Sequence, residues 1–376
     1  MSRSLHRPPA GHPGPSRARR RARVPLALAG IALALAPVAA CSREVIDDDG
    51  NVHLTFVTAF PRTSENNDGF FMWAEEVERI APWITIDYRG GPEVMGPFVL
   101  IEGVSSGAID GAHMPGDYYV DQLAVAQMFR FTPFTPMEER ENGVFDLFHA
   151  IHREGINVEY LGHSNAGAPQ LLFLRGAPVD TADFSGKAIR TSSATSNMVR
   201  SMGGAPVDMP GGEIYTAMER GAIDGTGWAS VGPVSLGLPD VVDWEIAPRF
   251  YDSIANTVMN ADRFDSLDQR TQDALREAMV NIEPAIFERY QELSRGEVAA
   301  WREAGVERID LPEADAEEML EVAYVEAWDF LGWAEMAERY PDAQRIRDAF
   351  EDEYERVGLL ESVPGGTVIE PEEASS

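Results

Sequence analysis

Apolar and polar positions along the chain follow strand periods in some segments and helix periods in others. Residues His53–Ala59 and Ile84–Tyr88 are short and rich in β-branched residues, which predicts two strands. Apolar residues at helical spacing predict a helix over Phe70–Ile80. The same patterns predict helices over Val94–Ser106, Glu138–Arg153 and Gly212–Arg220, and a strand over Ala108–Ala112. Strands and helices that alternate in this way indicate an α/β fold.

The last third of the chain is more uniformly helical. Residues Leu267–Val306 contain few helix breakers, with Leu275, Met279 and Ile286 at helical spacing. A second helical region, acidic and rich in aromatic residues, extends from Ala314 to about Arg356. Long helices here could brace the fold or pack against a second copy in a homodimer, and the sequence leaves both open.

A five-residue pattern occurs twice in the chain. Gly107–Gly111 and Gly221–Gly225 both read Gly-Ala-Ile-Asp-Gly, and each follows a predicted helical stretch. In both copies the first glycine stands where a helix C-cap belongs, and we expect the Ala-Ile pair to enter a short strand. The repeat predicts two similar α/β lobes, one built on each copy.

The first 40 residues have the composition of an export signal. They hold seven arginines and no acidic residue, and all seven arginines precede the apolar run Val24–Ala36. A basic head, a short apolar body and small residues before the cleavage site are typical of a secretory signal peptide. Val38-Ala39-Ala40-Cys41 resembles a bacterial lipobox, which implies a periplasmic protein anchored by a lipid on Cys41. An ordinary cleavage site beside a stray cysteine is the alternative.

The charge of the chain excludes one large class of partners. It carries 31 basic and 62 acidic residues, a formal net charge of −31, which would repel nucleic-acid phosphates. Hydrophobic residues make up 44% of the sequence, enough for one large core or two moderate ones. No segment after the signal reaches 18 consecutive apolar residues, so we expect no further membrane span.

Two motifs suggest catalysis but fit it poorly. His149 and His152 stand three residues apart on a predicted helix and could face a zinc ion, although an ordinary helix face explains them as well. Gly162–Ala166 nearly matches the nucleophile elbow of serine hydrolases, with Ser164 at its centre and Ala166 in place of the final glycine. No phosphate-binding glycine motif is found, so nucleotide binding has no support.

Three other features favour the binding of a small anion. Arg190 ends the predicted strand Lys187–Arg190, at the edge where open α/β sheets bind ligands, and its planar fork matches a carboxylate. A surface ion pair is the alternative. Glu213 begins a helix after a Pro-Gly-Gly turn, where free N–H groups attract anions, although the helix dipole also explains an acid there. Trp228 follows the second repeat and either walls a pocket or packs in the core.

In order and spacing, these segments resemble the second lobe of the solute-binding proteins of TRAP transporters, the tripartite ATP-independent periplasmic carriers. The matching motifs are Gly186–Arg190, Gly204–Pro210, Glu213–Met218 and Gly221–Gly225, with Gly90–Val94 resembling the first lobe. The resemblance covers roughly His53 to Phe330. It implies an α/β, two-lobed periplasmic-binding-protein fold, class II-like, with long C-terminal helices. Such a protein closes on an organic acid and delivers it to a small and a large membrane subunit.

The resemblance also carries binding roles to individual positions. The family's carboxylate-binding arginine falls on Arg190, a polar contact three residues later on Ser193, and a pocket residue on Trp228. The Pro-Gly-Gly-Glu-Ile-Tyr segment around Glu213 is closest to the branch that binds 2-oxo acids. Apolar walls over the rest of the ligand are expected from Trp228, Tyr118 and Phe60.

The chain departs from that branch at the position of its metal ion. The branch has a glutamate where this chain has Gly227, and its metal-binding glutamine falls near Pro169, with Gln170 one place off. Both departures weigh against a cation that bridges the ligand, so we expect no cofactor. Residues 166–169 also lack the arginine that some dicarboxylate and sialic-acid relatives carry, which favours a monocarboxylate.

The predicted organisation has four segments. A lipoprotein signal peptide takes residues 1–40, a tether 41–52, the two-lobed domain 53–360, and an acidic tail 361–376. Lobe 1 would hold about 53–165 with part of 250–300, and lobe 2 about 166–250 with the C-terminal helices. The alternatives are the receptor of an ATP-driven transporter, a sensor with the same fold, and an exported serine hydrolase that uses Ser164.

Overall fold

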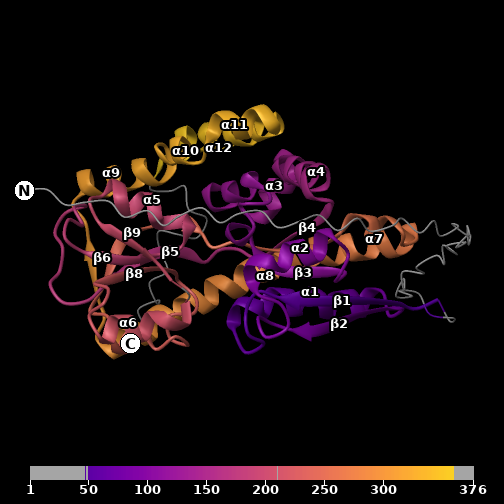
Figure 1. The fold of residues 1–376 in the computed structure, drawn as a ribbon, viewed down its shortest axis with the longest axis horizontal. Coiled ribbons are helices and arrows are strands. Elements are labelled where there is room, and N and C mark those ends of the chain that lie inside the picture. The colour runs from indigo at the N-terminus through magenta and orange to yellow at the C-terminus, as the bar shows by residue number, and fades with distance from the viewer. Residues whose placement is uncertain (1–46, 48–49, 210, 360–376) are drawn as a thin grey trace, which may run out of the picture. The chain divides into compact units, whose positions relative to one another are not determined.

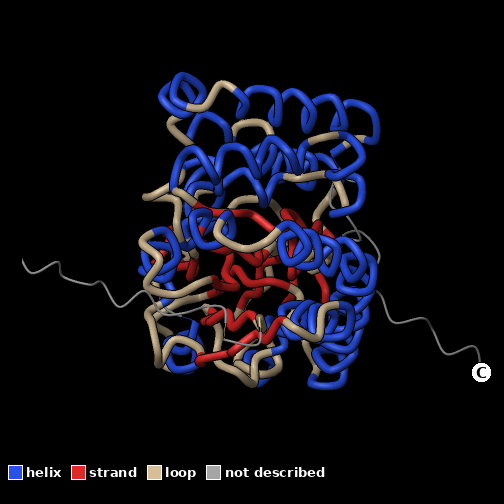
Figure 2. Tube along the Cα trace, turned by 90° about the vertical axis from the view of Figure 1, so that its right-hand side faces the viewer, coloured by secondary structure: helices blue, strands red, loops and turns tan. Residues whose placement is uncertain are grey.

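The computed structural model describes residues 47, 50–209 and 211–359, apart from the side chains of residues 193 and 194. The predicted signal peptide, Cys41, most of the tether and the tail 361–376 lie outside the described residues. In the described part, strands occupy the interior and helices lie on the outside (Figure 2). None of the helices in this part is both long and apolar enough to cross a membrane.

The first sheet has five strands in the order β2-β1-β3-β10-β4 (Figure 1). β1 runs parallel to β2 and β3, whereas β10 pairs antiparallel with β3 and β4. The strands are β1 Val52–Thr58, β2 Ile84–Gly90, β3 Gly111–Pro115, β4 Val158–Asn165 and β10 Ala255–Asn260. Phe56 on β1 packs with Phe70 and Trp73 of α1 (Asp68–Ile80), and all three side chains are fully buried.

The second sheet has six strands in the order β11-β9-β5-β8-β6-β7. β6 runs parallel to β7 and β8, and β5 runs antiparallel to β8 and β9. The strands are β5 Pro169–Leu174, β6 Ala188–Thr191, β7 Ala205–Asp208, β8 Gly225–Ala229, β9 Trp244–Asp252 and β11 Glu307–Asp310. Leu171 and Phe173 share a core with α6 (Ile214–Glu219), while Leu172 and Leu174 belong to the core that includes α5 (Ser193–Ser201). Both faces of this sheet are therefore covered.

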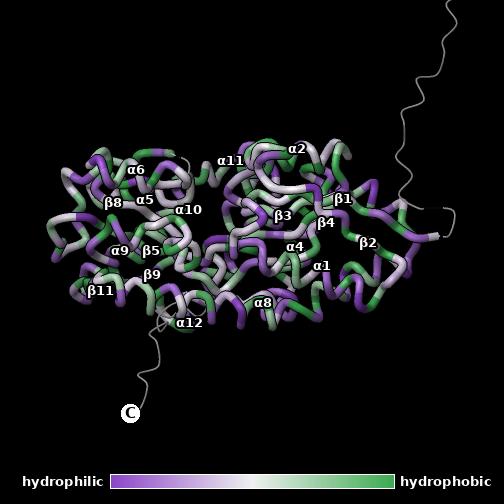
Figure 3. The backbone as a smooth tube through the Cα atoms, turned by 90° about the horizontal axis from the view of Figure 1, so that it is seen from below, coloured by the Kyte–Doolittle hydropathy of each residue, from purple (hydrophilic) through white to green (hydrophobic). Residues whose placement is uncertain are grey.

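Two chain crossings and one long helix link the sheets. β4 leads into β5 and β9 leads into β10. The buried carboxylate of Asp252 joins the crossings, because it accepts hydrogen bonds from the N–H groups of Gly167 at 2.7 Å and Ala168 at 2.9 Å. The helix α8 (Gln269–Ala304) lies alongside α1 (Figure 3) and gives Tyr290 to the core of the first sheet and Trp301 to that of the second.

The remaining helices pack around these sheets. α9 (Glu313–Tyr324) contacts β9 and α5, and α12 (Asp342–Val357) contacts α4 (Val144–Ile156). The helical region predicted from Ala314 onward is divided into four helices. The other elements are α2 Leu100–Ser105, α3 Pro136–Asn142, α7 Ala261–Asp265, α10 Ala327–Phe330 and α11 Trp333–Arg339.

Three predicted helix boundaries are wrong for local reasons. The helix predicted over residues 138–153 is two helices, α3 and α4, because Gly143 between them takes a left-handed φ of 85°. The helix predicted over 94–106 is an α-helix only in α2, after a 3-10 turn that begins at Pro97. The helix predicted over 212–220 is reduced to α6, because a 3-10 turn occupies residues 211–213.

The two Gly-Ala-Ile-Asp-Gly copies form the same turn in different sheets. Gly107 and Gly221 follow their helices with φ values of 74° and 66°, which agrees with the expected C-cap glycine. The strands, however, begin only at the second glycine, so the Ala-Ile pair lies in the turn. The strand predicted over Ala108–Ala112 is therefore wrong and is replaced by β3.

An aspartate explains why the turn is longer than predicted. The carboxylate of Asp110 accepts a hydrogen bond from the N–H of Thr55 on β1 at 2.8 Å. In the second copy, Asp224 accepts one from the N–H of Ala188 on β6 at 2.7 Å. Each carboxylate thus ties its turn to the neighbouring strand, and the next strand starts one residue later.

Candidate functional site

Arg190 lies near the end of β6 and is only 7% exposed. Its Nε donates a hydrogen bond to the carbonyl oxygen of Met209 at 3.0 Å, and its Nη1 donates to that of Gly227 at 3.1 Å. Two backbone segments therefore fix the guanidinium in place. Burial lowers the pKa of Arg190 from its ordinary value, which shows how poorly this position solvates a charge.

Arg190 differs from the other buried arginines in forming no ion pair with an acidic side chain, although the charge of Asp208 acts on it from a longer distance. Of the three arginines buried among the described residues, Arg130 pairs with Asp117 at 2.6 Å and Arg249 with Glu245 at 2.7 Å. No carboxylate in the described part of the chain forms an ion pair with Arg190. The surface ion pair that the sequence left open is thus wrong.

One aromatic side chain lies over this guanidinium, and a second, which follows a strand of the first sheet, lies within its electrostatic reach. The Cζ atom of Arg190 lies 4.9 Å from the ring centroid of Trp228, which is half-buried on β8. Tyr118 follows β3 in the first sheet; burial raises the pKa of Tyr118, and the positive charge of Arg190 lowers it in turn. That interaction places the phenol in the neighbourhood of the guanidinium. The ring of Phe60 lies 6.3 Å from that of Tyr118.

The other predicted binding residues are less closely associated with Arg190. Gln170 lies on β5 opposite Ala229, next to the pair formed by Leu171 and Trp228. Glu213 is exposed at the start of α6 and forms no side-chain capping hydrogen bond. Ser193 begins α5, and its side chain is not among those described. The structure therefore brings Trp228 and Tyr118 near Arg190, places Phe60 beside Tyr118, and leaves Glu213 at the surface.

A family model for bacterial extracellular solute-binding proteins, family 7 (DctP), matches residues 72–330. The chain belongs to this family. It is therefore a solute-binding protein of the extracytoplasmic kind and not an enzyme, and the resemblance to TRAP solute-binding proteins is confirmed.

Individual relatives agree with this assignment. The monocarboxylate 2-oxoacid-binding periplasmic protein of Nostoc sp. (strain PCC 7120) is 22% identical over 260 residues, 65% of this chain and 70% of the relative. A TRAP periplasmic solute-binding protein from Desulfovibrio salexigens, solved with orotic acid, has a TM-score of 0.70 at 16% identity, covering 81% of this chain and 99% of that one. DctP7 from Bordetella pertussis, a receptor binding pyroglutamic acid, has a TM-score of 0.69 at 16% identity, with 80% and 99% covered. The predicted two-lobed fold is confirmed.

The residues around Arg190 do not fit the metal ion of the family branch that binds 2-oxo acids. Gly227 offers no carboxylate at the position where that branch has a glutamate. The described residues contain no group of three His, Cys, Asp or Glu side chains placed to hold a metal. His149 and His152 do not converge either, since His149 contacts Glu159 at 3.0 Å while His152 accepts a hydrogen bond from the Tyr119 hydroxyl.

Ser164 is not a nucleophile elbow. It lies inside β4 rather than at a strand-to-helix turn, and it is fully buried. Its hydroxyl donates a hydrogen bond to Nδ1 of His113 at 2.7 Å and accepts one from Thr257 at 2.8 Å. The imidazole donates through Nε2 to the carbonyl oxygen of Asn66, so the Ser–His pair belongs to the core. The hydrolase alternative is therefore wrong.

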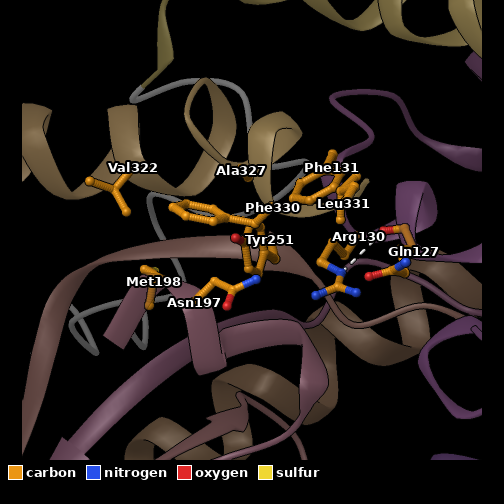
Figure 4. A pocket seen from close by; sticks show the side chains of 10 residues that line it. All are labelled: Gln127, Arg130, Phe131, Asn197, Met198, Tyr251, Val322, Ala327, Phe330 and Leu331. Carbon is orange, nitrogen blue, oxygen red and sulfur yellow. Dashed lines mark hydrogen bonds between the residues drawn. The ribbon is translucent and has the colours of Figure 1, made fainter. Parts of the chain in front are cut away.

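A small cavity lies beneath the C-terminal helices and is lined by Arg130, Asn197, Tyr251 and Phe330, among others (Figure 4). Its volume of about 20 Å³ suits one water molecule and is too small for an organic acid. The guanidinium of Arg130 is already paired with Asp117. This cavity is therefore no rival to the region around Arg190.

The close packing of the Trp228 indole against Gly211 gives a first prediction. A Cβ added at Gly211 would lie 2.5 Å from Cη2 of Trp228, whereas one added at Gly212 would meet nothing within 4 Å. We expect Gly211→Ala to displace the indole and weaken binding at Arg190 roughly 5- to 150-fold, because overpacking costs about 1–3 kcal/mol. Titration calorimetry and tryptophan fluorescence measure the effect. The matched control, Gly212→Ala, should behave as wild type; equal losses in both variants would contradict the assignment of Trp228 to the site.

Proposed function

We propose that this protein is the receptor of a TRAP transporter and that it binds a small organic acid through Arg190. The observation that carries the proposal is a buried arginine that forms no ion pair with any carboxylate of the described chain. A buried charge is costly unless it is paired and hydrogen-bonded. A ligand carboxylate offers the missing charge, and its two oxygens match the guanidinium fork.

The relatives support an acid as the ligand. The Nostoc protein is named for monocarboxylate 2-oxoacids, and two of the solved neighbours are named for orotic acid and pyroglutamic acid, whereas a third is named for malonate, a dicarboxylate. Monocarboxylate 2-oxoacids, orotic acid and pyroglutamic acid each carry one carboxylate, which fits a single carboxylate-binding arginine. We propose a monocarboxylate here too, because a second ligand carboxylate would need a second arginine. Both other buried arginines are paired with acidic residues of the chain, and residues 166–169 contain no arginine.

The arrangement around Arg190 suits a mechanism of closure on the ligand. The carboxylate docks on Arg190 from the second sheet, beside Trp228, while Tyr118 and Phe60 come from the first. Closing these elements excludes water, so the local dielectric falls and the ion pair strengthens as it forms. The ligand favours the closed state only by its higher affinity for it. The formal charge of −31 does not attract an anion, so the field of Arg190 must do so locally.

The rest of the predicted organisation belongs to the same proposal. We propose export through a signal peptide over residues 1–40, lipid attachment at Cys41, and delivery of the acid to small and large TRAP membrane subunits. The first sheet corresponds to lobe 1 and the second to lobe 2. Gln170 and Ser193 are the proposed further contacts of the ligand.

Thermal unfolding against a panel of acids tests this function. The purified protein is stripped of bound solute by unfolding and refolding, then scanned with pyruvate, 2-oxobutyrate, lactate, pyroglutamate, orotate and malonate. At about 100 times the dissociation constant, a ligand raises the stability of the native state by about 2.7 kcal/mol, a shift of several degrees. Lactamide, the neutral analogue of lactate, is the matched control. Equal shifts with lactate and lactamide, or none with any acid, would contradict the proposal.

A further inference from the structure

The indole ring of Trp228 presents a free hydrogen-bond donor at the edge of the region around Arg190. The ring lies over the guanidinium, and its Cη2 edge packs against Gly211. Nε1 is at the other edge of the ring and makes no hydrogen bond with any described residue. A Cβ built on Gly232 would lie 3.1 Å from Nε1, so the N–H is next to the bare Cα of that glycine. Indole N–H groups inside folded proteins usually have an acceptor, so this donor calls for one.

A second donor, from the side of the first sheet, reaches the same point. Asn66 lies in the 3-10 turn Glu65–Asn67, which follows β1, and it is 8% exposed. The Cβ built on Gly232 would lie 3.6 Å from Nδ2 of Asn66, and the next nearest atom, Cδ1 of Trp228, is already 4.0 Å away. The space beside Gly232 is therefore flanked by two nitrogen donors, one from each lobe.

Hydrogen bonds hold both sides of this space in place. Oδ1 of Asn66 accepts a hydrogen bond from Nδ2 of Asn165 at 3.3 Å, which leaves the amide nitrogen of Asn66 turned toward Gly232. The carbonyl oxygen of Asn66 accepts another from Nε2 of His113 at 2.8 Å. On the other side, the buried carboxylate of Glu297 accepts a hydrogen bond from the N–H of Gly232 at 3.0 Å. The two donors are thus positioned before any ligand arrives.

We propose that Trp228 and Asn66 form a second subsite, which binds an oxygen of the ligand other than those of its carboxylate. This inference rests on the proposed function and adds the feature that the acid must carry. Two N–H donors select an acceptor, so the ligand is an acid with a carbonyl or hydroxyl oxygen near its carboxylate, such as a 2-oxo acid or a lactam acid. One indole ring contacts both subsites, so a single small acid fills both.

The origin of the two donors also links this oxygen to closure. Nε1 of Trp228 belongs to the second sheet and Nδ2 of Asn66 to the segment that follows β1 of the first. An oxygen bound by both donors therefore joins the two lobes. An acid without that oxygen leaves both donors unpaired in the closed state, which disfavours closure on the wrong compound.

The test compares each acid with an analogue that lacks the second oxygen. The acids of the panel that bind to wild type are paired with propionate for pyruvate or lactate, butyrate for 2-oxobutyrate, cyclopentanecarboxylate for pyroglutamate, benzoate for orotate and isovalerate for malonate. By titration calorimetry, wild type should bind the acid about 10- to 100-fold more tightly than its analogue, because the analogue leaves the donors without an acceptor.

Two variants assign this preference to the proposed donors. Asn66→Leu and Trp228→Phe each remove one N–H, and in each the ratio of the two affinities should fall about 5- to 10-fold. A purely structural role for either residue would weaken acid and analogue equally and leave the ratio unchanged. Asn142 is the matched control, since this exposed amide of the same lobe caps α4 by accepting from the N–H of Val144 at 3.0 Å. Asn142→Leu should keep the wild-type ratio.

The outcomes separate this inference from the function on which it rests. Equal affinity of wild type for acid and analogue, or an unchanged ratio in either folded variant, would overturn the second subsite while the proposed function stands. If none of the acids binds to wild type, the proposed function fails and this inference fails with it.

Discussion

Arg190→Ala is expected to abolish most of the affinity for organic acids, by about 30- to 3,000-fold. Removing one partner of a buried charged pair costs roughly 2–5 kcal/mol, and about 1.4 kcal/mol corresponds to a factor of ten. Arg190→Lys should also lose most of the affinity, because an ammonium group cannot reproduce the two parallel hydrogen bonds of the guanidinium. Titration calorimetry with the acids that stabilise wild type measures both variants.

The control for this prediction lies on the next helix. Arg200 on α5 is exposed and donates a hydrogen bond to Asn197 on its own helix at 2.8 Å. Arg200→Ala removes one positive charge from the same lobe without touching the site, so its affinity should be that of wild type. If Arg200→Ala and Arg190→Ala lose affinity to the same extent, then general charge attraction, and not a specific pair, holds the acid.

Low pH should destabilise the fold because two buried histidines then become protonated. Burial lowers the pKa of His113 and that of His152 to about 4, from an ordinary value of 6.5. A folded-state pKa below the unfolded value means that the neutral form is favoured by folding. The stability from each histidine is therefore complete above pH 6.5 and lost as the pH falls toward 4. At about 1.4 kcal/mol per pKa unit, each histidine accounts for about 3 kcal/mol.

A comparison of variants isolates this contribution. Asp252 acts in the opposite direction, since burial raises its pKa to about 6 and its protonated form stabilises the fold in acid. We therefore compare wild type and variant by the decrease in the free energy of unfolding from pH 6.5 to pH 4. Urea denaturation of the protein without bound ligand measures this decrease. In His152→Gln this decrease should be about 3 kcal/mol smaller than in wild type. An identical decrease in His152→Gln would show that His152 is protonated without cost.

Much of the fold could be predicted because its signals are local. The β-branched runs mark β1 and β2 to within a few residues, and Gly107 marks the end of a helix. The errors arise where a distant residue decides the local structure. The turn after Gly107 is held by Asp110 bonding to Thr55, 55 positions away in the sequence, and no local pattern contains that contact.

The same distinction applies to the site. Arg190 could be predicted as a candidate because a strand end and a motif both point to it. That it lacks an acidic partner could not be predicted in a chain with 62 acidic residues, since this depends on where all of them lie.

The long helix α8 has a consequence for the way the whole protein melts. Its N-terminal half contributes Leu275 and Met279 to the core of the first sheet, and its C-terminal end contributes Val298 and Trp301 to the core of the second. Figure 1 shows the ribbon of this helix passing along both sheets. Unfolding of either sheet would remove the packing partners of one end of α8, and the other end of the same helix packs in the core of the other sheet. We therefore expect the two lobes to unfold as one cooperative unit, so that an acid bound at Arg190, as proposed, would protect the first lobe from unfolding as well.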